Sequence, residues 1–330
     1  MAEDIISISG KFNKYIHHID LKEFGKERIL SSYVAEFDGC SLILDCGSSL
    51  EVNKLLRYLK NHDIGLDSIK YLVTTHHHFD HNGGAWKLYN KIKPHNPDFK
   101  IIANEQTKYL LNNFETHLNR AKRTFGDFIG DMKEIEENAF MIVKPEIEFN
   151  KSDLKRFIID SFSLNGKRVD LGLIKTPGHT PDHQCPFFVI DDEVDFVFFG
   201  EAAGTLYHSK ELLTMPTSMP VYFEYEPYMN SLQNLKELNA KLAGFCHFGV
   251  VCGRDNVEYI LNENELLTEE FRSKIIKFYE EKPETKYIVE KIMPYLTPRT
   301  DLIGNDHPIM KNIVLGVVYG MMMDLGYRKD

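Results

Sequence analysis

The stretch Thr74–Gly84, TTHHHFDHNGG, gathers side chains of the kind that bind metal ions. Four histidines and one aspartate fall within six residues: His76, His77, His78, Asp80 and His81. In an irregular loop, an H-x-H pair can direct both imidazoles at one point, and the following Asp-His pair can serve a second point nearby. Imidazole together with carboxylate suits zinc or iron. A lone histidine is usually packed or solvated, but this density favours a metal site, with His77 directed away from it.

Three later residues are candidates to complete two metal sites. His179 lies in a turn punctuated by glycine and proline, KTPGHTPDH. Glu201 follows an apolar run in FFGEAAG, and His247 follows another in FCHFGVVCG. A buried carboxylate is costly unless it is paired or coordinated, which favours a ligand role for Glu201. The chain thus offers H-x-H-x-D-H, and then His, Glu and His in that order.

This order of motifs resembles the metallo-β-lactamase superfamily of hydrolases. Five segments carry the resemblance: LILDCG, THHHFDHNGG, TPGHTPDH, FFGEAAG and CHFGVVCG. They extend over about residues 20–255, and the second and third segments together are highly specific. The fourth segment stands where the family usually has a Gly-Asp motif.

The resemblance implies a set of metal ligands. One metal would be bound by His76, His78 and His179, and a second by Asp80, His81 and His247. Glu201 takes the place of the bridging carboxylate, which is usually an aspartate. Because glutamate is one methylene longer, it either bridges from a backbone set further back or binds one metal only. Asp45, in LILDCG, is expected to orient a ligand or its loop.

The resemblance also implies the chemistry. Two divalent ions would share a bridging hydroxide that attacks the substrate. Zinc is the expected metal, with iron or manganese as alternatives. Asp80 would then receive or pass a proton. Tyr207 and His208 follow Glu201 closely, so they are candidate catalytic side chains at the mouth of the site, with a surface or packing role as the alternative. His183 is expected to be an ordinary hydrogen-bonded histidine.

Within the superfamily, the sequence favours a hydrolase that acts on a small-molecule substrate. The start of the chain has no apolar run of signal-peptide length, which disfavours a secreted β-lactamase. A flavodiiron reductase is disfavoured because no flavodoxin-like segment follows and because His78 replaces its usual carboxylate. Cleavage of a small ester, thioester or lactone, as in glyoxalase II and lactonases, is the expected function. A phosphodiester or sulfate-ester hydrolase, or a non-catalytic metal-binding ligand sensor, is the alternative.

Composition bears on partners and location. Lys and Arg number 39 against 49 Asp and Glu, so the formal net charge is −10 and nucleic-acid binding is not expected. No apolar run approaches the roughly 18 residues of a membrane span, so no membrane association is expected. Five irregularly spaced cysteines fit reduced thiols in the cytoplasm.

The hydrophobic pattern predicts the elements that position these residues. Two strands around a turn at Asp38-Gly39 are expected within 29–46, and further strands within 69–75, 99–104 and 143–200. Helices are expected at 50–62, after the histidine loop, at 105–142, at 228–242 and from about 256 onward. Breaks in the last helical region are expected near Pro294, Pro298 and Gly304. Two strand-rich segments with helices attached predict an α/β fold, an αββα sandwich of two mixed β-sheets flanked by helices, with a C-terminal helical extension.

Two domains are expected. Residues 1–255 would form the metallo-β-lactamase-like catalytic domain, with a helical insertion at about 105–142, and residues 256–330 the extension. The phenylalanines of the insertion either cap the metal site, which would favour a substrate with an apolar part, or pack the helices onto the sheet. The apolar C-terminal helix either completes the cap or forms a homodimer contact.

Overall fold

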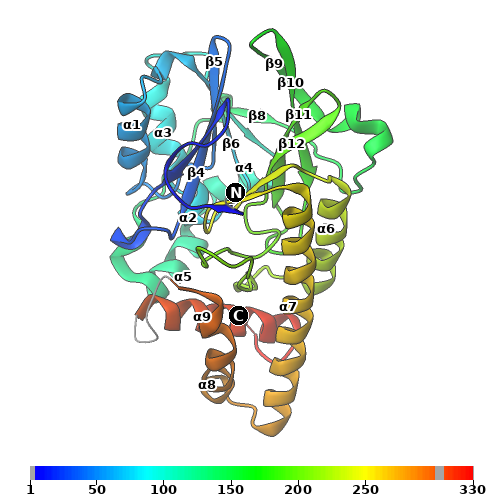
Figure 1. Cartoon of the computed structure of the whole chain (residues 1–330). Helices are drawn as coiled ribbons and strands as arrows, with labels where there is room; N and C mark the ends of the chain where they lie inside the picture. The colour runs from blue at the N-terminus through cyan, green and yellow to red at the C-terminus, as the bar shows by residue number, and fades with distance from the viewer. Residues whose placement is uncertain (1–3, 302–307, 330) are drawn as a thin grey trace.

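The computed structural model describes residues 4–301 and 308–329 of the chain, and it is an αββα sandwich. Two seven-stranded sheets lie face to face, each with helices on its outer side (Figure 1). One sheet has the strand order β1-β14-β13-β12-β11-β10-β9 and the other β2-β3-β4-β5-β6-β7-β8. Both sheets combine parallel and antiparallel pairs, so the predicted fold class is confirmed.

The strands of the sheet that begins with β2 come mostly from the first half of the chain. They are β2 (Gly10–Lys11), β3 (Ile16–Asp20), β4 (Ser31–Phe37), β5 (Cys40–Leu44), β6 (Ile69–Val73), β7 (Lys100–Ala103) and β8 (Phe140–Ile142). The other sheet comprises β1 (Ile5–Ile6), β9 (Ile158–Leu164), β10 (Lys167–Lys175), β11 (Gln184–Ile190), β12 (Glu193–Phe198), β13 (Leu242–Gly244) and β14 (Val250–Cys252). The chain therefore builds one sheet and then the other, except that β1 crosses to pair with β14.

Helices fill the connections and the C-terminal region. The α-helices are α1 (Val52–Asn61), α2 (Phe79–Asn82), α3 (Ala85–Ile92), α4 (Glu105–Asn112), α5 (Glu115–Phe125), α6 (Tyr225–Glu237), α7 (Arg254–Glu281), α8 (Thr285–Leu296) and α9 (Pro308–Asp324). Short 3-10 helices are η1 (Glu23–Gly25), η2 (Leu66–Ser68), η3 (Gly126–Ile129), η4 (Glu137–Ala139), η5 (Lys151–Phe157) and η6 (Thr297–Arg299). No helix within the described ranges has both the length and the apolarity that crossing a bilayer requires.

The alternation of side chains along the strands explains the layers. Successive residues of a strand point to opposite faces, so a strand in the middle layer serves two cores. In β4, Tyr33 and Ala35 pack between the two sheets, whereas Val34 packs on the outer side. In β12, Phe196 and Phe198 likewise face the opposite sheet. The inner strands are therefore buried on both faces, which is the reason for their nearly continuous apolar sequences.

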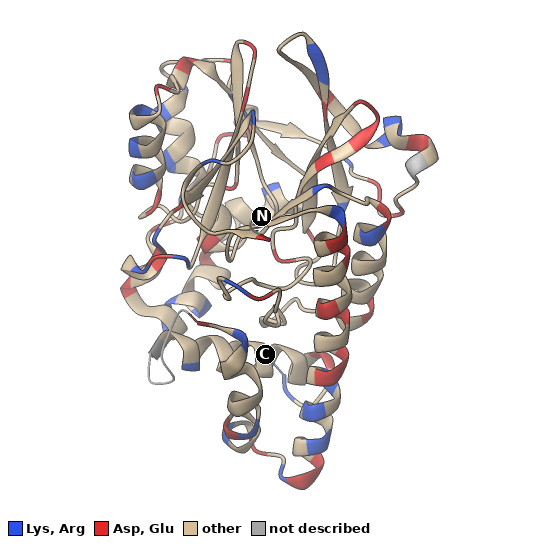
Figure 2. Ribbon diagram, in the orientation of Figure 1, with Lys and Arg blue, Asp and Glu red and all other residues tan. Residues whose placement is uncertain are grey.

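The outer helices bury one face each. In α1, Val52, Leu55 and Leu59 are spaced by three and four residues and pack on the sheet that contains β5 and β6. Helices α6 and α7 cover the other sheet. Figure 2 shows Lys and Arg side by side with Asp and Glu along the outer helices, whereas the strands of the sandwich are mostly uncharged. In α1, for example, Arg57 and Lys60 are exposed, opposite the apolar face.

Two expectations about the elements are wrong, and three strands lie where none was predicted. The helical pattern expected over 105–142 ends at Ile129, apart from the short η4, and residues 140–142 form β8, the edge strand beside β7. The strands of the first 20 residues were not expected. Helix α8 runs through Pro294 and ends at Leu296, so the break expected near Pro298 is present, whereas an additional break at Pro283 separates α7 from α8. The break expected at Gly304 lies outside the described residues.

The C-terminal helices share a core with the sandwich. Side chains of α7, α8 and α9 belong to one buried apolar cluster with residues of β11 and β12, among them Phe271, Ile292 and Val317. Helix α9 runs beneath the sandwich in Figure 1, close to α5. The division of the chain near residue 255 stays a prediction, because this cluster is continuous across it.

Candidate metal centre

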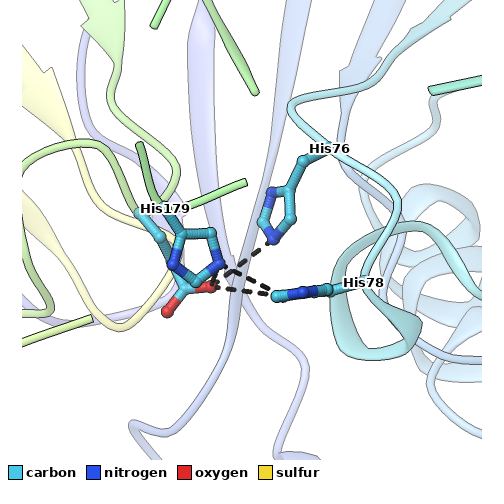
Figure 3. Close-up of side chains that lie close together, drawn as sticks. His76, His78 and His179 are labelled. Carbon is cyan, nitrogen blue, oxygen red and sulfur yellow. Dashed lines mark hydrogen bonds and ion pairs between the residues drawn. The ribbon is translucent and has the colours of Figure 1, made fainter. Parts of the chain in front are cut away.

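Four histidines surround one carboxylate oxygen. Oε2 of Glu201, in the turn after β12, lies 2.7 Å from Nε2 of His179 and 3.3 Å from Nε2 of His81. The same oxygen lies 3.5 Å from Nε2 of His76 and 3.9 Å from Nδ1 of His78. Figure 3 shows His76, His78 and His179 converging on this carboxylate from two sides of the site. The H-x-H pair and the two later motifs therefore meet, as the sequence predicts.

A second group lies beside the first. Oδ2 of Asp80 lies 3.2 Å from Nε2 of His81 and 3.3 Å from Nε2 of His247. Asp80 and His81 belong to the single-turn helix α2 directly after the histidine loop, and His247 follows β13. Because Glu201 also contacts His81, its oxygen lies between the two groups.

The separations fit metal coordination. Four ligands at the usual zinc–ligand distances form a tetrahedron whose corners lie about 3.3 Å apart. In the group of Asp80, His81, His247 and Glu201, the three measured separations are 3.2, 3.3 and 3.3 Å. In the other group, Nε2 of His179 lies 3.1 Å from Nδ1 of His78. The ligand atoms of His76, His78, His179 and Glu201 therefore lie close enough together to hold an ion, and Asp80, His81 and His247 lie beside them.

Unpartnered nitrogens support the same interpretation. Nε2 of His76 and Nε2 of His81 are buried and have no hydrogen-bond partner among the described residues. A buried polar atom without a partner is destabilising, and in native proteins it usually indicates a missing water or ion. Burial alone would raise the pKa of the Glu201 carboxyl, but His179 and the neighbouring histidines hold that pKa well below its usual range. The ionised carboxylate and the free nitrogen lone pairs suit a cation.

Hydrogen bonds on the far side of the rings fix which nitrogen faces the site. Nδ1 of His179 donates to the carbonyl oxygen of Thr217 at 2.7 Å, and Nδ1 of His247 donates to that of Ile29 at 2.6 Å. A carbonyl can only accept, so the proton is on Nδ1 and the lone pair on Nε2. Partners of this kind orient ligating histidines in metal sites.

Asp45 holds the ligand loop. Its carboxylate accepts from the backbone N–H and the hydroxyl of Thr75 and from the side-chain amide of Asn82. The Thr75 hydroxyl, while donating to Asp45, can accept Nδ1–H of His76 at 2.9 Å. Burial raises the pKa of Asp45 to about 6, even though His81 and these donors favour its ionised form. Asp45 thus occupies the loop-orienting place expected for it.

Two other polar residues join the loops that carry the ligands. Asp182 accepts from the backbone N–H and Nδ1–H of His77, both at 2.9 Å, which turns the His77 ring away from Glu201. His183 accepts the backbone N–H of Glu201 through Nε2 at 3.1 Å. The structure therefore gives His183 a specific role in placing Glu201, beyond the ordinary hydrogen bonding expected for it.

The turn before His179 requires a glycine. Gly178 has a φ of +134°, and a Cβ atom there would lie 2.3 Å from the backbone nitrogen of Tyr228 in α6. Only glycine combines that conformation with so close an approach. The TPGH segment can therefore pack directly against α6 and hold His179 in place.

A cavity of about 160 Å³ opens onto this site. Its floor includes His78, Asp80, Glu201 and His247. Its walls come from α5, from α9, from the 216–222 segment and from the turn that contains Glu23 and Phe24. Phe125 of α5 lines the cavity, so the insertion covers the site with an aromatic side chain, whereas Phe140 packs in the core. The apolar C-terminal helix completes the cap.

Close packing holds α9 against the cavity wall. A Cβ atom at Gly320 would lie 1.9 Å from the carbonyl oxygen of Ser218, so only glycine fits there. The hydroxyl of Ser218 also donates to the carbonyl oxygen of Val317 at 2.8 Å. Helix α9 and the 216–222 segment therefore form one wall.

Tyr207 and His208 are placed differently. Tyr207 is buried, lines the cavity, and has its ring 5.7 Å from that of His247. His208 is partly exposed and is not among the residues that line the cavity, and its Nδ1 accepts from the backbone N–H of Glu211 at 2.9 Å. The structure therefore brings Tyr207 but not His208 to the candidate site.

The sequence did not single out His117 or Glu23, which the structure places at the site. His117 of α5 stacks on His78 with ring centroids 5.0 Å apart, and its Nε2 accepts the backbone N–H of Phe79 at 3.2 Å. Glu23 of η1 is buried and lines the cavity. Neither residue lies in a recognisable motif, so only the fold brings them here.

Comparisons with known proteins agree with the geometry. The Metallo-beta-lactamase superfamily profile matches residues 25–247, more than half of the chain. The Metallo-beta-lactamase fold-containing protein ST1585 of Sulfurisphaera tokodaii is 28% identical over 212 residues, which cover 61% of this chain and 70% of that protein. The chain belongs to the metallo-β-lactamase superfamily.

Solved structures extend the likeness of fold to the C-terminal helices. The crystal structure of ST1585 from Sulfolobus tokodaii has a TM-score of 0.62 at 23% identity, and covers 94% of this chain and 98% of that chain. A metallo-beta-lactamase family protein of Thermus thermophilus, TTHA1429, has a TM-score of 0.57 at 16% identity, with 90% and 88% covered. At these identities the likeness concerns the fold alone.

Proposed function

We propose that the protein is a metal-dependent hydrolase that holds two divalent ions and cleaves a small ester, thioester or lactone. Zinc is the expected metal. One observation carries the proposal: a single oxygen of Glu201 lies within 4 Å of nitrogens from both ligand groups, at the floor of a cavity. His76, His78 and His179 would hold one ion, and Asp80, His81 and His247 the other, with Glu201 between them. A bound ion pair supplies an activated water and polarises the scissile group.

Asp80 would contribute to the reaction as an ionised carboxylate. Burial would raise the pKa of Asp80, but the neighbouring His81 and His247 keep that pKa well below its usual range. Asp80 is therefore ionised at neutral pH, so it can bind a cation and accept a hydrogen bond from the attacking water.

Tyr207 is suited to the developing oxyanion. Burial, and then the nearby carboxylate of Glu23, raise the pKa of its phenol well above the usual value. The phenol stays protonated and can donate a hydrogen bond to a substrate oxygen as negative charge develops there.

The cavity supports a small substrate with an apolar part. Its volume of about 160 Å³ is close to that of an engineered cavity of about 150 Å³ that holds benzene. Phe24, Phe125 and Ile313 contribute apolar side chains to its walls. These side chains suit the apolar part of an uncharged ester, thioester or lactone.

The test is turnover by zinc-loaded protein with a panel of p-nitrophenyl esters, acyl thioesters and γ-lactones. Asp80→Asn should reduce turnover at least about 100-fold while the thermal unfolding midpoint stays within a few degrees. Asp127→Asn, on the exposed surface of η3, is the matched control and should retain full activity. Unchanged turnover by Asp80→Asn would contradict the site assignment, and the absence of turnover across the panel would contradict the proposed substrate class.

A further inference from the structure

Glu23 has an unusual place in the cavity wall. It is only 1% exposed and lines the cavity, and its Oε1 has no hydrogen-bond partner among the described residues. A buried polar atom of this kind costs about 1–3 kcal/mol when it is left unpaired. The metal ligands do not explain Glu23, because it makes no contact of 4 Å or less with any of their nitrogens in the described structure. A partner from outside the chain would remove this cost.

The backbone around Glu23 is held in an unusual conformation. Both neighbours, Lys22 and Phe24, have left-handed backbone conformations, with φ of 48° and 52°. Asp20 fixes the two ends of the turn, since its carboxylate accepts from the backbone N–H of Lys22 at 2.8 Å and of Arg28 at 3.0 Å. Unfavourable conformations of this kind persist only where the surrounding structure imposes them.

The cap also holds this turn. The ring of Phe24 stacks on Phe125 of the insertion, with centroids 5.5 Å apart and planes 17° apart. It also contacts the ring of Phe128 edge-on at 6.0 Å. The turn, the cap helix α5 and the cavity therefore form one packed unit, with the Glu23 carboxyl on the inside.

Electrostatics place the carboxyl near the reacting end of the cavity. Burial, and then the charge of Asp80, raise the pKa of Glu23 well above its usual range. Glu23 in turn raises the pKa of Tyr207, the phenol beside His247. The carboxyl thus lies within electrostatic range of both Asp80 and Tyr207, at the boundary between the apolar walls and the candidate metal centre.

We propose that Glu23 is a substrate-binding residue in the cavity wall, and that its carboxyl group binds a hydroxyl group carried by the substrate. The inference rests on the proposed function only in taking this cavity as the place where the substrate binds. A hydroxyl both donates and accepts, so it can pair with a carboxyl group whether that group is protonated or ionised. An apolar substituent would leave Oε1 unpaired.

The experiment compares two unreactive probes of cavity size that differ in one hydroxyl, benzyl alcohol and toluene. Dissociation constants for zinc-loaded protein are measured by calorimetry or ligand-observed NMR. Wild type should bind benzyl alcohol about ten-fold more tightly than toluene, because one buried hydrogen bond contributes about that factor. Glu23→Leu should lose the preference and keep toluene binding. Glu27→Leu, an exposed glutamate two residues beyond η1, should leave both affinities unchanged.

Thermal unfolding separates binding from a structural role. Because Glu23→Leu removes a buried unpartnered carboxyl, its unfolding midpoint should equal or exceed that of wild type. A hydroxyl preference that survives in Glu23→Leu would mean that the metal or another residue binds the alcohol, and would overturn the proposal. Absence of the preference in wild type, or loss of both probes with a lower midpoint in Glu23→Leu, would overturn it as well. None of these readings needs turnover, so an inactive protein with the predicted preference would contradict the proposed function alone.

Discussion

Oε2 of Glu201 lies 3.3 Å from Nε2 of His81, a histidine of the neighbouring ligand group. The glutamate side chain, although longer than the usual aspartate, therefore places its oxygen between the two groups. The backbone N–H of Glu201, bound to Nε2 of His183, fixes where the side chain begins. In the proposed two-metal site, Glu201 would therefore be placed to contact both ions.

Glu201→Ala should weaken metal binding in both groups. It removes the one anionic atom that contacts histidines of both, so metal content should fall below two per chain and turnover should fall about 100-fold or more. Glu201→Asp should give an intermediate loss, because the shorter side chain withdraws the oxygen from His81. Metal content by mass spectrometry checks both variants. Glu211→Ala, on the exposed surface ten residues away, should change neither quantity.

His117→Ala should weaken metal binding without removing a ligand of the proposed set. His117 stacks on His78 and accepts the backbone N–H of Phe79, so its loss frees the loop that carries His78. Zinc affinity, measured by competition with a chromophoric chelator, should fall about 10–100-fold. Lys122→Ala, an exposed residue of the same helix, is the control. Equal affinity in His117→Ala would show that the cap helix does not position His78.

Asp182→Ala should destabilise the fold. Asp182 is fully buried and accepts two hydrogen bonds from His77, which joins the histidine loop to the TPGH turn. Breaking a buried pair of this kind typically costs about 3–5 kcal/mol, because the partner is left buried and unpaired. Urea unfolding of the metal-free protein measures the cost directly. Asp98→Ala, in an exposed turn, should change the free energy of unfolding by less than about 0.5 kcal/mol.

Acid should destabilise the metal-free protein through His18. Burial lowers the pKa of this histidine to about 4, against about 6.5 in an unfolded chain. Between these pH values the unfolded state binds more protons, so the free energy of unfolding falls as the pH falls from about 6.5 to 4. The contribution of His18 is at most about 3 kcal/mol over that window. Above about pH 6.5 it is constant.

Comparison of variants isolates this contribution, since other buried histidines titrate as well. His18→Gln should reduce the slope of unfolding free energy against pH by about one proton between pH 4.5 and 6.5. The exposed His95 supplies the control variant His95→Gln, which should keep the wild-type slope. An unchanged slope in His18→Gln would mean that His18 is protonated in the folded protein.

Much of the fold follows from local pattern. The hairpin of β4 and β5 was predicted at its turn, Asp38-Gly39, because alternating apolar residues flank a strong turn dipeptide. Strand β6 was predicted because it is apolar and ends at the histidine loop. The edge strand β8 was not, since three residues after a helical region carry too little pattern, and pairing with β7 alone decides their conformation.

The ligand positions followed from motif order, whereas the surroundings of the site did not. Every residue of the proposed ligand set lies in a segment with an informative sequence context, and the structure brings all seven together. Glu23 and His117 reach the site through packing of a turn and a helix that are remote in sequence. His208 follows Tyr207 directly, yet it turns to cap its own loop. Sequence spacing alone does not show which of these residues reach the site and which do not.

The most direct test of the account is the metal content per chain of protein purified without chelator or histidine tag. Mass spectrometry should find about two equivalents of a divalent metal, with zinc as the expected metal. Asp80→Asn or Glu201→Ala should lower that number. About one equivalent would contradict the bridging role of Glu201. No bound metal, with no binding after zinc is added, would contradict the proposed hydrolase.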